Sequence, residues 1–305
     1  MMYDIIIIGA GTAGLTAAIY GRRALKKVLV FEANSYGGQI INTLDIENYP
    51  GYEHIDGYTY STKLLTQAQN LGAEILFEKV IDIKDNGDYK EVITSDNTYK
   101  TYTIILATGS SNRKLGVERE KELIGKGVSY CATCDGTFFK GKDVAVVGGG
   151  NAALEEAIYL ADIVNKVYLI HRRDTFSGET AYVEKIKTIN NIEIVFNSNV
   201  TKLNGEEKLE SIEVTDKDNN IRNINVSGLF VSIGQVPENN NFAELVDIDE
   251  KGYIIAGEDC HTNVEGIYVA GDTRTKLLRQ LVTAAGDGAV AATEAIKYIN
   301  GRKSE

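Results

Sequence analysis

Several features are scarce in this 305-residue sequence, and each scarcity excludes a class of protein. Three cysteines are too few for the disulfide framework of a secreted domain and indicate a reducing compartment. The formal net charge of −11 argues against nucleic acid or an acidic membrane as a partner. The apolar run Ile5–Ile8 is too short to span a bilayer and lacks the basic flank of a signal peptide. Together these absences predict a cytoplasmic protein.

Proline is also rare, occurring only at Pro50 and Pro237, so the turns must rely on glycine, asparagine and aspartate. The hydrophobic fraction of 43% and charged fraction of 25% are those of a folded globular protein. The length is typical of about two domains, each large enough to bury its own core.

The first motif is a strand, a glycine turn, a helix and a second strand: Tyr3–Ile8, 9–14, Leu15–Leu25 and Val28–Phe31. Gly9, Gly11 and Gly14 have the spacing of a dinucleotide-binding turn, in which small residues admit a pyrophosphate to a helix N-terminus. Glu32 ends the second strand, where a carboxylate accepts hydrogen bonds from a ribose and repels a 2′-phosphate. The unit therefore predicts binding of FAD or NAD.

A second unit repeats this pattern as Val144–Val147, 148–153, Leu154–Ala161 and Lys166–Ile170. His171 lies 23 positions after Gly148, as Glu32 lies 23 positions after Gly9. Arg172 and Arg173 follow it, and guanidinium groups bind phosphate bidentately, so the second unit favours NADPH. The chain thus contains a distant internal duplication, and we expect an α/β protein with two Rossmann-like nucleotide-binding domains.

Other segments have strand or helix character. Expected strands are Glu74–Phe77, Glu91–Thr94, Thr103–Ala107, Leu229–Val231 and a segment within 266–272, and an amphipathic helix is expected over Leu281–Ile299. Two of the strands end in glycine turns, at 107–109 and 232–234.

Cys131 and Cys134 lie between the two units with two residues between them. Such a pair is redox-active, part of a zinc site or functionally silent. Zinc needs four ligands, and Cys260 with His261 lacks finger-like spacing, so we favour a redox dithiol and expect no metal. Asp135 is placed to transfer the proton of thiol–disulfide exchange, and it can also be a cap or turn residue. Cys260 is expected to be a buried or half-exposed thiol.

The motifs taken in order resemble those of the low-molecular-weight bacterial thioredoxin reductases. They comprise the turn at 9–14, Gly37-Gly38-Gln39, Asn48-Tyr49-Pro50-Gly51, Ala107-Thr108-Gly109, Cys131-Ala-Thr-Cys134-Asp135-Gly136, Gly271-Asp272 and Arg279-Gln280. The resemblance extends over essentially the whole chain and implies a pyridine nucleotide-disulfide reductase type of fold. It implies an FAD domain over 1–113 and 243–305, and an NAD(P)H-binding domain over 114–242 that contains the dithiol.

The resemblance also implies a mechanism and a set of site residues. Electrons pass from NADPH through FAD to the dithiol and then to thioredoxin, with Cys134 facing the flavin, Cys131 attacking the partner's disulfide and Asp135 as acid–base. Domain rotation is implied, with hinges near 112–116 and 237–242, in a homodimer. Positions assigned to the cofactors are Gly9, Gly11, Thr12, Ala13, Gly14, Glu32, Gly38, Gln39, Asn48, Val80, Ala107, Thr108, Gly109, Gly271, Asp272, Arg279, Gln280, Gly148, Gly150, Asn151, Ala152, Ala153, His171, Arg172, Arg173 and Gly234.

One departure leaves the electron donor open. NADPH-using members of the family carry a third arginine at the position of Ser177, and a serine is common at the position of Ala152. Losing one charge-assisted phosphate contact lowers affinity by about 1–3 kcal/mol. NADPH is favoured because the glycines and two arginines are present, while ferredoxin and NADH stay as alternatives.

Three other protein classes are disfavoured. A ferredoxin–NADP reductase of this fold lacks the Cys131/Cys134 pair, and a peroxide-system flavoprotein has an additional N-terminal dithiol domain, whereas this sequence begins with the FAD strand. A flavin sensor or zinc scaffold is the non-enzymatic alternative.

Overall fold

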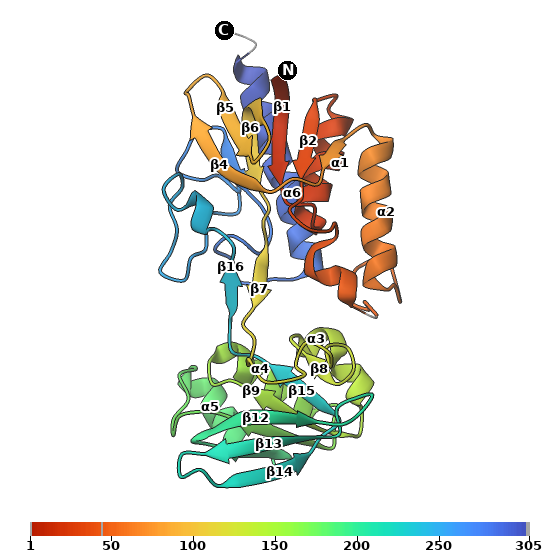
Figure 1. Ribbon diagram of the computed structural model, residues 1–305, viewed down its shortest axis with the longest axis vertical. Coiled ribbons are helices and arrows are strands. Elements are labelled where there is room, and N and C mark those ends of the chain that lie inside the picture. The colour runs from red at the N-terminus through yellow and green to blue at the C-terminus, as the bar shows by residue number, and fades with distance from the viewer. Residues whose placement is uncertain (1, 44, 303–305) are drawn as a thin grey trace. The chain divides into compact units, whose positions relative to one another are not determined.

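The computed structural model describes residues 2–43 and 45–302, which form two compact units. The first unit comprises residues 1–111 and 236–305, and the second comprises 112–235 (Figure 1). Residues 236–242, which the sequence assigned to the second domain, lie in the first unit. The two connecting segments pair as the strands β7 (Ser110–Asn112) and β16 (Gln235–Pro237).

The first unit is built around a seven-stranded mixed sheet in the order β3-β2-β1-β6-β5-β4, with β17 paired to β6. The strands β1, β2, β3, β6 and β17 are mutually parallel. Strand β5 is antiparallel to both of its neighbours, β6 and β4. The strands are β1 Met2–Ile8, β2 Val28–Phe31, β3 Glu74–Leu76, β4 Val80–Asp85, β5 Lys90–Thr94, β6 Thr98–Leu106 and β17 Ile267–Val269, and the helices are α1 Thr12–Arg23, η1 Gly38–Asn42, α2 Gly57–Asn70, η3 Asn240–Phe242 and α6 Leu281–Arg302.

Both faces of this sheet are buried, because successive side chains of a strand point to opposite faces. Ile5 and Ile7 of β1 pack in one core cluster, beneath α1 and α6, which contact each other. Ile6 and Ile8 pack in a second cluster with residues of 242–269 on the other face. The continuous isoleucine run of the sequence is thus a strand covered on both sides (Figure 1).

The second unit has a five-stranded parallel sheet in the order β11-β10-β9-β15-β8 and a three-stranded antiparallel sheet β12-β13-β14. One face of the parallel sheet packs on α4, and the other packs on the antiparallel sheet. The strands are β8 Val128–Ser129, β9 Asp143–Val147, β10 Lys166–Ile170, β11 Ile192–Val195, β12 Ser198–Asn204, β13 Ser211–Asp216, β14 Ile221–Asn225 and β15 Gly228–Val231, and the helices are α3 Ala132–Asp135, η2 Gly136–Phe139, α4 Asn151–Ala161 and α5 Thr180–Lys187.

The structure confirms the α/β class and the internal duplication. The backbone N–H of Gly9 donates to Phe31 in β2 at 2.7 Å, and that of Gly148 donates to Ile170 in β10 at 3.1 Å. Glu32 and His171 likewise donate to the strand beyond, β3 and the end of β11 respectively. The same hydrogen bonds therefore recur at the same positions of both units.

Helix α1 begins at Thr12 and α4 at Asn151, each three residues before the start expected from the sequence. The apolar periodicity becomes visible only at Leu15 and Leu154, whereas the helical backbone begins directly after an extended glycine N-cap. The final helix α6 begins at Leu281 as expected and continues to Arg302. No helix within residues 2–43 and 45–302 combines the length and apolarity that crossing a bilayer requires.

Candidate cofactor and dithiol sites

The glycines of the first turn are required by close backbone packing. Gly9 has φ +111, and a Cβ there would lie 2.3 Å from the carbonyl oxygen of Ala107. A Cβ on Gly14 would lie 1.9 Å from the carbonyl oxygen of Gly9, so this glycine lets α1 pack against the turn. A Cβ on Gly11 would have the Gly38 Cα, 4.0 Å away, as its nearest neighbour. The backbone of Gly11 is therefore open to a phosphate.

Glu32 lies directly after β2 and is fixed by two backbone donors. Its Oε2 accepts a hydrogen bond from Ala10 N–H at 2.9 Å, and its Oε1 accepts one from Asn34 N–H at 2.9 Å. Each carboxylate oxygen has a second lone pair, which suits acceptance from ribose hydroxyls. The carboxylate is thus held beside the glycine turn, as the spacing predicts for an adenosine site.

The C-terminal part of the chain completes this site. Gly271 follows β17 with φ +82, and a Cβ there would lie 2.9 Å from the Ala13 Cβ of α1. The adjacent Asp272 has an Oδ1 that is buried without a hydrogen-bond partner among the described residues, and burial raises the pKa of its carboxyl. An unpaired buried acceptor is costly unless a ligand hydroxyl donates to it. The residues of the first unit therefore fit an FAD.

The structure places the remaining positions assigned to the first cofactor as follows. Arg279 stacks on Tyr253, with the guanidinium carbon 4.0 Å from the ring centroid, and Gln280 accepts a hydrogen bond from Asn48 at 3.2 Å. The Gln39 amide donates to the Ser110 carbonyl oxygen. Helix α1 begins with Thr12 and Ala13, and η1 begins with Gly38. The segment after β6 contains Ala107 and Gly109 on either side of Thr108. Strand β4 begins with Val80, which is 6% exposed and packs in the hydrophobic core.

Thr108 forms part of a polar network that joins both ends of the first unit. Its hydroxyl lies 2.8 Å from that of Thr273 and 3.2 Å from the Asn239 Oδ1. The Asn239 amide donates to the carbonyl oxygens of Gly252 and Thr273. The segment after β6 is thus joined to the segment after β17, which brings the Ala107–Gly109 and Gly271–Asp272 motifs together.

The second glycine turn has the same geometry with one substitution. Gly148 has φ +156, and a Cβ there would lie 2.3 Å from the Ser232 carbonyl oxygen, two residues before Gly234. Ala153 occupies the position of Gly14, is fully buried, and packs its methyl group against Gly148. A Cβ on Gly150 would have the Ser177 Oγ, 4.0 Å away, as its nearest neighbour, so the backbone of Gly150 is open like that of Gly11.

Asn151 begins α4 and joins the turn to α5. Its Oδ1 accepts from the Glu179 N–H at 2.7 Å, and its amide donates to the Glu179 carboxylate at 2.8 Å. Ala152, the next residue, is exposed. The Asn151 side chain therefore positions the segment that contains Ser177.

The end of β10 presents two unpaired cations. Arg172 and Arg173 are exposed, and neither guanidinium forms an ion pair with another described residue. His171 packs below them, where burial lowers its pKa, and its Nε2 has no partner within the described ranges. The Ser177 hydroxyl donates to the Gly149 carbonyl oxygen at 3.1 Å. The second unit therefore fits a dinucleotide with an additional phosphate, for which Arg172 and Arg173 offer two positive charges and Ser177 a neutral hydroxyl.

The cysteine pair forms a disulfide in the second unit. Cys131 and Cys134 are bonded, with 5.3 Å between their Cα atoms, and both residues are half-buried. Cys131 is the N-cap of the short helix α3, which ends at Asp135. Cys260 is a free thiol that is fully buried in the first unit, as expected.

Asp135 is held beside the disulfide by a hydroxyl. The Ser129 Oγ donates to the Asp135 Oδ2 at 2.6 Å, and it accepts a hydrogen bond from the Cys131 N–H at 3.1 Å. Burial raises the pKa of the Asp135 carboxyl, whereas the Ser129 hydroxyl lowers it. The structure thus places an acid with an elevated pKa in a hydrogen-bonded chain that leads to the backbone of Cys131.

Comparisons with known proteins identify the family of this chain. A model of the pyridine nucleotide-disulphide oxidoreductase family matches residues 3–288. The thioredoxin reductase of Listeria innocua is 42% identical over 300 residues, covering 98% of this chain and 94% of the relative. The chain belongs to the thioredoxin reductases. This result confirms the resemblance that the motifs indicated.

Solved structures of thioredoxin reductases agree with this assignment. That of Streptococcus pyogenes superposes with a TM-score of 0.93 at 38% identity, covering 98% of this chain and 99% of that chain. A ferredoxin-flavin thioredoxin reductase from Clostridium acetobutylicum superposes with a TM-score of 0.56 at 31% identity, each chain being fully covered.

One residue of the dithiol site was missed by the sequence analysis. Glu156 of α4 has a carboxyl that contacts the Ala132 N–H of α3 and the Ser232 hydroxyl, while its Oε2 is buried without a partner among the described residues. Burial raises the pKa of this carboxyl to about 7. The signal was available, because Glu156 lies between the fully buried Ala153 and Leu160 at helical spacing.

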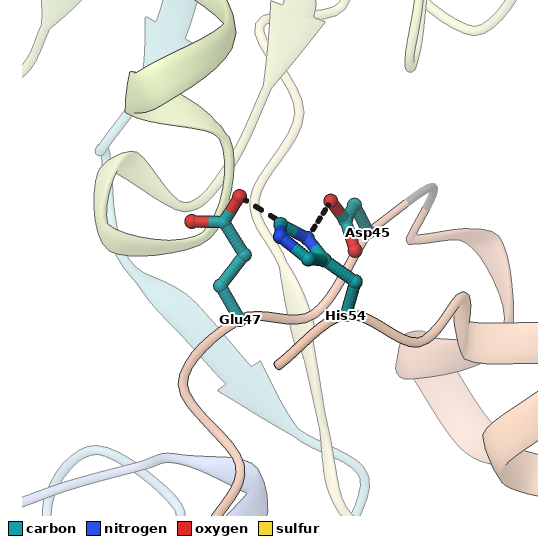
Figure 2. Close-up of side chains that lie close together, drawn as sticks. All are labelled: Asp45, Glu47 and His54. Atoms are coloured by element: carbon teal, nitrogen blue, oxygen red, sulfur yellow. Dashed lines mark hydrogen bonds and ion pairs between the residues drawn. The ribbon is translucent and has the colours of Figure 1, made fainter. Parts of the chain in front are cut away.

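A second polar cluster flanks the Asn48–Gly51 motif in the sequence. His54 and Asp45 form an ion pair of 2.8 Å, and Glu47 lies 3.6 Å from the same ring nitrogen (Figure 2). The Asp45 carboxylate is the main reason that the pKa of His54 is raised. The side chain of His54 is 65% exposed, so this cluster is accounted for as a surface ion pair.

Proposed function

We propose that the chain transfers electrons from NADPH through FAD and the Cys131–Cys134 disulfide to oxidised thioredoxin. The observation that carries the proposal is the half-buried disulfide with Asp135 held beside it, in the same unit as an open glycine turn and two arginines that form no ion pair with another described residue. The printed names of the similar proteins support thioredoxin as the substrate.

The first unit is proposed to bind FAD, which supplies hydride acceptance from the nicotinamide and electron transfer to the disulfide. The open backbone at Gly11 approaches the pyrophosphate, and Glu32 accepts from the ribose of the adenosine. Asp272 provides the buried acceptor for a hydroxyl of the ribityl chain. Arg279, Gln280, Asn48 and Gln39 line the remaining walls.

The second unit is proposed to bind NADPH rather than NADH. Arg172 and Arg173 follow His171, which stands at the position of Glu32, and neither guanidinium has an ion-pair partner among the described residues, so both can contact a 2′-phosphate. Gly148, Gly150 and Gly234 leave room for the pyrophosphate and the nicotinamide end. This assignment makes the second unit, residues 112–235, the NADPH domain, with hinges near 112–116 and 237–242.

The dithiol chemistry follows from the residues around the disulfide. Two electrons and two protons convert the S–S bond into two thiols, and Asp135 exchanges protons with the site. The Cys131 thiolate then attacks the disulfide of thioredoxin, forming a mixed disulfide and releasing one thiol of the partner. Cys134 displaces the second thiol and restores the S–S bond of the reductase.

A parallel anaerobic titration tests the electron donor. Purified holoprotein is mixed with NADPH, NADH or reduced ferredoxin, and the loss of flavin absorbance is followed. We expect NADPH to bleach the flavin fastest. Bleaching by ferredoxin alone would establish the second candidate, which is favoured by Ser177 and by the similarity to the ferredoxin-flavin enzyme.

The dithiol is tested by substitution. Cys134→Ser is expected to retain FAD and bleaching by NADPH but to lose thioredoxin reduction, whereas Cys260→Ser is the matched control and keeps activity. Full activity of Cys134→Ser contradicts the proposal. A homodimer in the cytoplasm also stays a prediction, and light scattering of the purified protein checks the dimer.

A further inference from the structure

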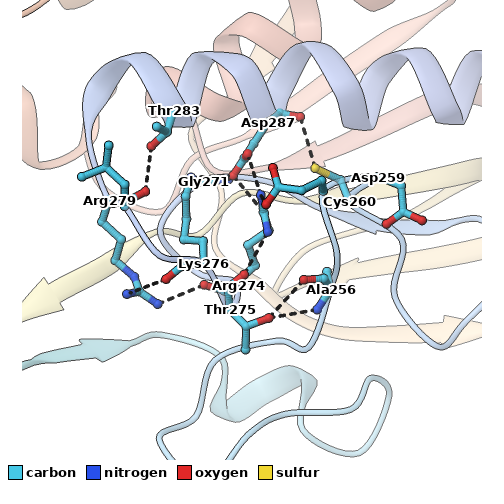
Figure 3. A network of polar contacts seen from close by, with 12 residues as sticks. Ala256, Asp259, Cys260, Gly271, Arg274, Thr275, Lys276, Arg279, Thr283 and Asp287 are labelled. Carbon is cyan, nitrogen blue, oxygen red and sulfur yellow. Dashed lines mark hydrogen bonds and ion pairs between the residues drawn. The ribbon is translucent and has the colours of Figure 1, made fainter.

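Asp287 of α6 is the centre of a buried polar network (Figure 3). The residue is 7% exposed. Its Oδ2 accepts hydrogen bonds from the Gly271 N–H at 3.0 Å, the Arg274 Nε at 2.9 Å and the Lys276 Nζ at 2.8 Å, and its Oδ1 accepts one from the Arg274 Nη2 at 2.9 Å. One carboxylate therefore binds three residues of the segment that joins β17 to α6.

The network depends on the negative charge of Asp287. The side chains of Arg274 and Lys276 are 2% and 4% exposed, and their cations keep the pKa of Asp287 below its ordinary value. The other carboxylate within ion-pair distance of Arg274 among the described residues is Glu258 at 3.6 Å, whose side chain is 96% exposed. Loss of the Asp287 charge thus leaves Lys276 with no ion-pair partner among the described residues and Arg274 with only the exposed Glu258, which is strongly unfavourable.

The segment held by Asp287 is the one that presents the cofactor residues. Asp272, with its unpaired Oδ1, lies between Gly271 and Arg274. The Arg279 guanidinium donates to the carbonyl oxygens of Asp272 at 3.4 Å and Arg274 at 3.1 Å, so the backbone fixed by Asp287 also fixes Arg279 (Figure 3). Among the described residues, the side chain of Asp287 hydrogen-bonds only to residues of 271–276, while its backbone oxygen is the acceptor for the Cys260 thiol.

We propose that Asp287 is a positioning residue for the flavin, which holds the Gly271–Asp272 turn against α6 so that the Asp272 acceptor is in place before FAD binds. Holding the turn in advance reduces the ordering that binding would otherwise require. The inference rests on the proposed FAD site and identifies Asp287 as the residue that fixes the backbone of that site.

The test compares FAD affinity and thermal stability in Asp287→Asn. The asparagine keeps an acceptor for the Gly271 N–H but removes the charge that binds Arg274 and Lys276. We expect the FAD dissociation constant of the reconstituted apoprotein to rise about 10- to 100-fold. The Tm of the apoprotein falls because two buried cations lose their shared partner, and the increase in Tm that FAD produces shrinks in addition.

Glu258→Gln is the matched control, because it removes the other carboxylate near Arg274 but leaves the network intact. We expect its FAD affinity to stay within about twofold of the wild type. A purely structural role for Asp287 predicts equal losses of Tm with and without FAD and an unchanged dissociation constant, and that result overturns the inference.

A double-mutant cycle shows whether Asp287 acts through Asp272. We expect Asp287→Asn to weaken FAD binding much less when Asp272→Ala is already present, because the alanine has already removed the acceptor that Asp287 positions. Independent, additive effects contradict the inference. Failure of the wild-type chain to bind FAD refutes the proposed function instead, so the two failures are distinguishable.

Discussion

In the proposed function, single side chains after β10 decide the choice of nicotinamide cofactor. Ser177 donates to the Gly149 carbonyl oxygen and carries no charge, while Arg172 and Arg173 stay exposed and unpaired among the described residues. Under the proposed function, the affinity for a 2′-phosphate depends on these two cations. This arrangement can be tested by adding and by removing charge.

Arg172→Ala and Arg173→Ala are each expected to raise the KM for NADPH about 10- to 100-fold, because each removes a charge-assisted phosphate contact. The KM for NADH, which has no 2′-phosphate, should change less than about threefold. Ser177→Arg is the opposite change and should lower the KM for NADPH. Steady-state kinetics with both cofactors measure these effects, and equal changes with NADH would contradict the phosphate assignment.

The hydroxyl of Ser129 tunes the acid next to the disulfide. Because this hydroxyl lowers the pKa of Asp135, Ser129→Ala should raise that pKa further. The pH at which the rate of thioredoxin reduction changes with Asp135 protonation should then move upward. Ser129→Thr keeps a hydroxyl and is expected to restore the wild-type pH profile.

Asp135→Asn removes the ionisable group itself. We expect thioredoxin reduction to slow about 100-fold, within the range of lost general acid–base catalysis. Bleaching of the flavin by NADPH should be unaffected. An unchanged rate and pH profile would show that Asp135 is only a turn residue.

At the scale of elements, the dithiol helix α3 packs on α4, and Glu156 lies at that contact. The pKa of Glu156 is about 7, above its ordinary 4.5, so the folded state binds the proton more tightly than the unfolded state. Its contribution to stability is greatest below about pH 4.5 and is lost as the pH rises through 7. That difference corresponds to at most roughly 3 kcal/mol.

Glu156→Gln should therefore raise the Tm at pH 8 and leave it nearly unchanged at pH 5, because a glutamine cannot ionise. The neighbouring Glu155 is exposed, and Glu155→Gln is the control that should leave the pH dependence as in the wild type. Thermal unfolding followed by circular dichroism between pH 5 and pH 8 measures the effect. Parallel curves for wild type and Glu156→Gln would show that the carboxyl is ionised throughout.

At the scale of the whole molecule, each unit has its own hydrophobic clusters. The clusters around β1 and β6 belong to the first unit, and those around β9 and β10 belong to the second. Two separate cores joined by two chain segments are expected to unfold separately when no ligand joins them.

We therefore expect two transitions in calorimetry of the apoprotein. FAD should raise the Tm of the first unit, and NADP⁺ should raise the Tm of the second. At a ligand concentration of 100 times the dissociation constant, each ligand adds about 2.7 kcal/mol to the free energy of unfolding of its unit. Isolated residues 112–235 should retain the transition that responds to NADP⁺. A single transition raised by both ligands would contradict the assignment of one cofactor to each unit.

The sequence by itself determined the local features of this protein. The Gly9 and Gly148 turns, the charge reversal from Glu32 to Arg172 and the Cys131/Cys134 pair depend on residues a few positions apart, where backbone sterics and covalent spacing fix the outcome. The duplication was visible for the same reason, since equal spacing produces equal strands, turns and helices.

Only the tertiary structure decided which distant side chains support these motifs. Asp287 meets Gly271 and Arg274 because α6 returns to the end of β17, and Glu156 meets Ala132 because α4 packs beneath α3. The sequence indicated only that Glu156 lies on the apolar side of its helix, whereas Asp287 looks like an ordinary helix position. Their roles come from burial and from the partners that long-range packing brings, which no local pattern encodes.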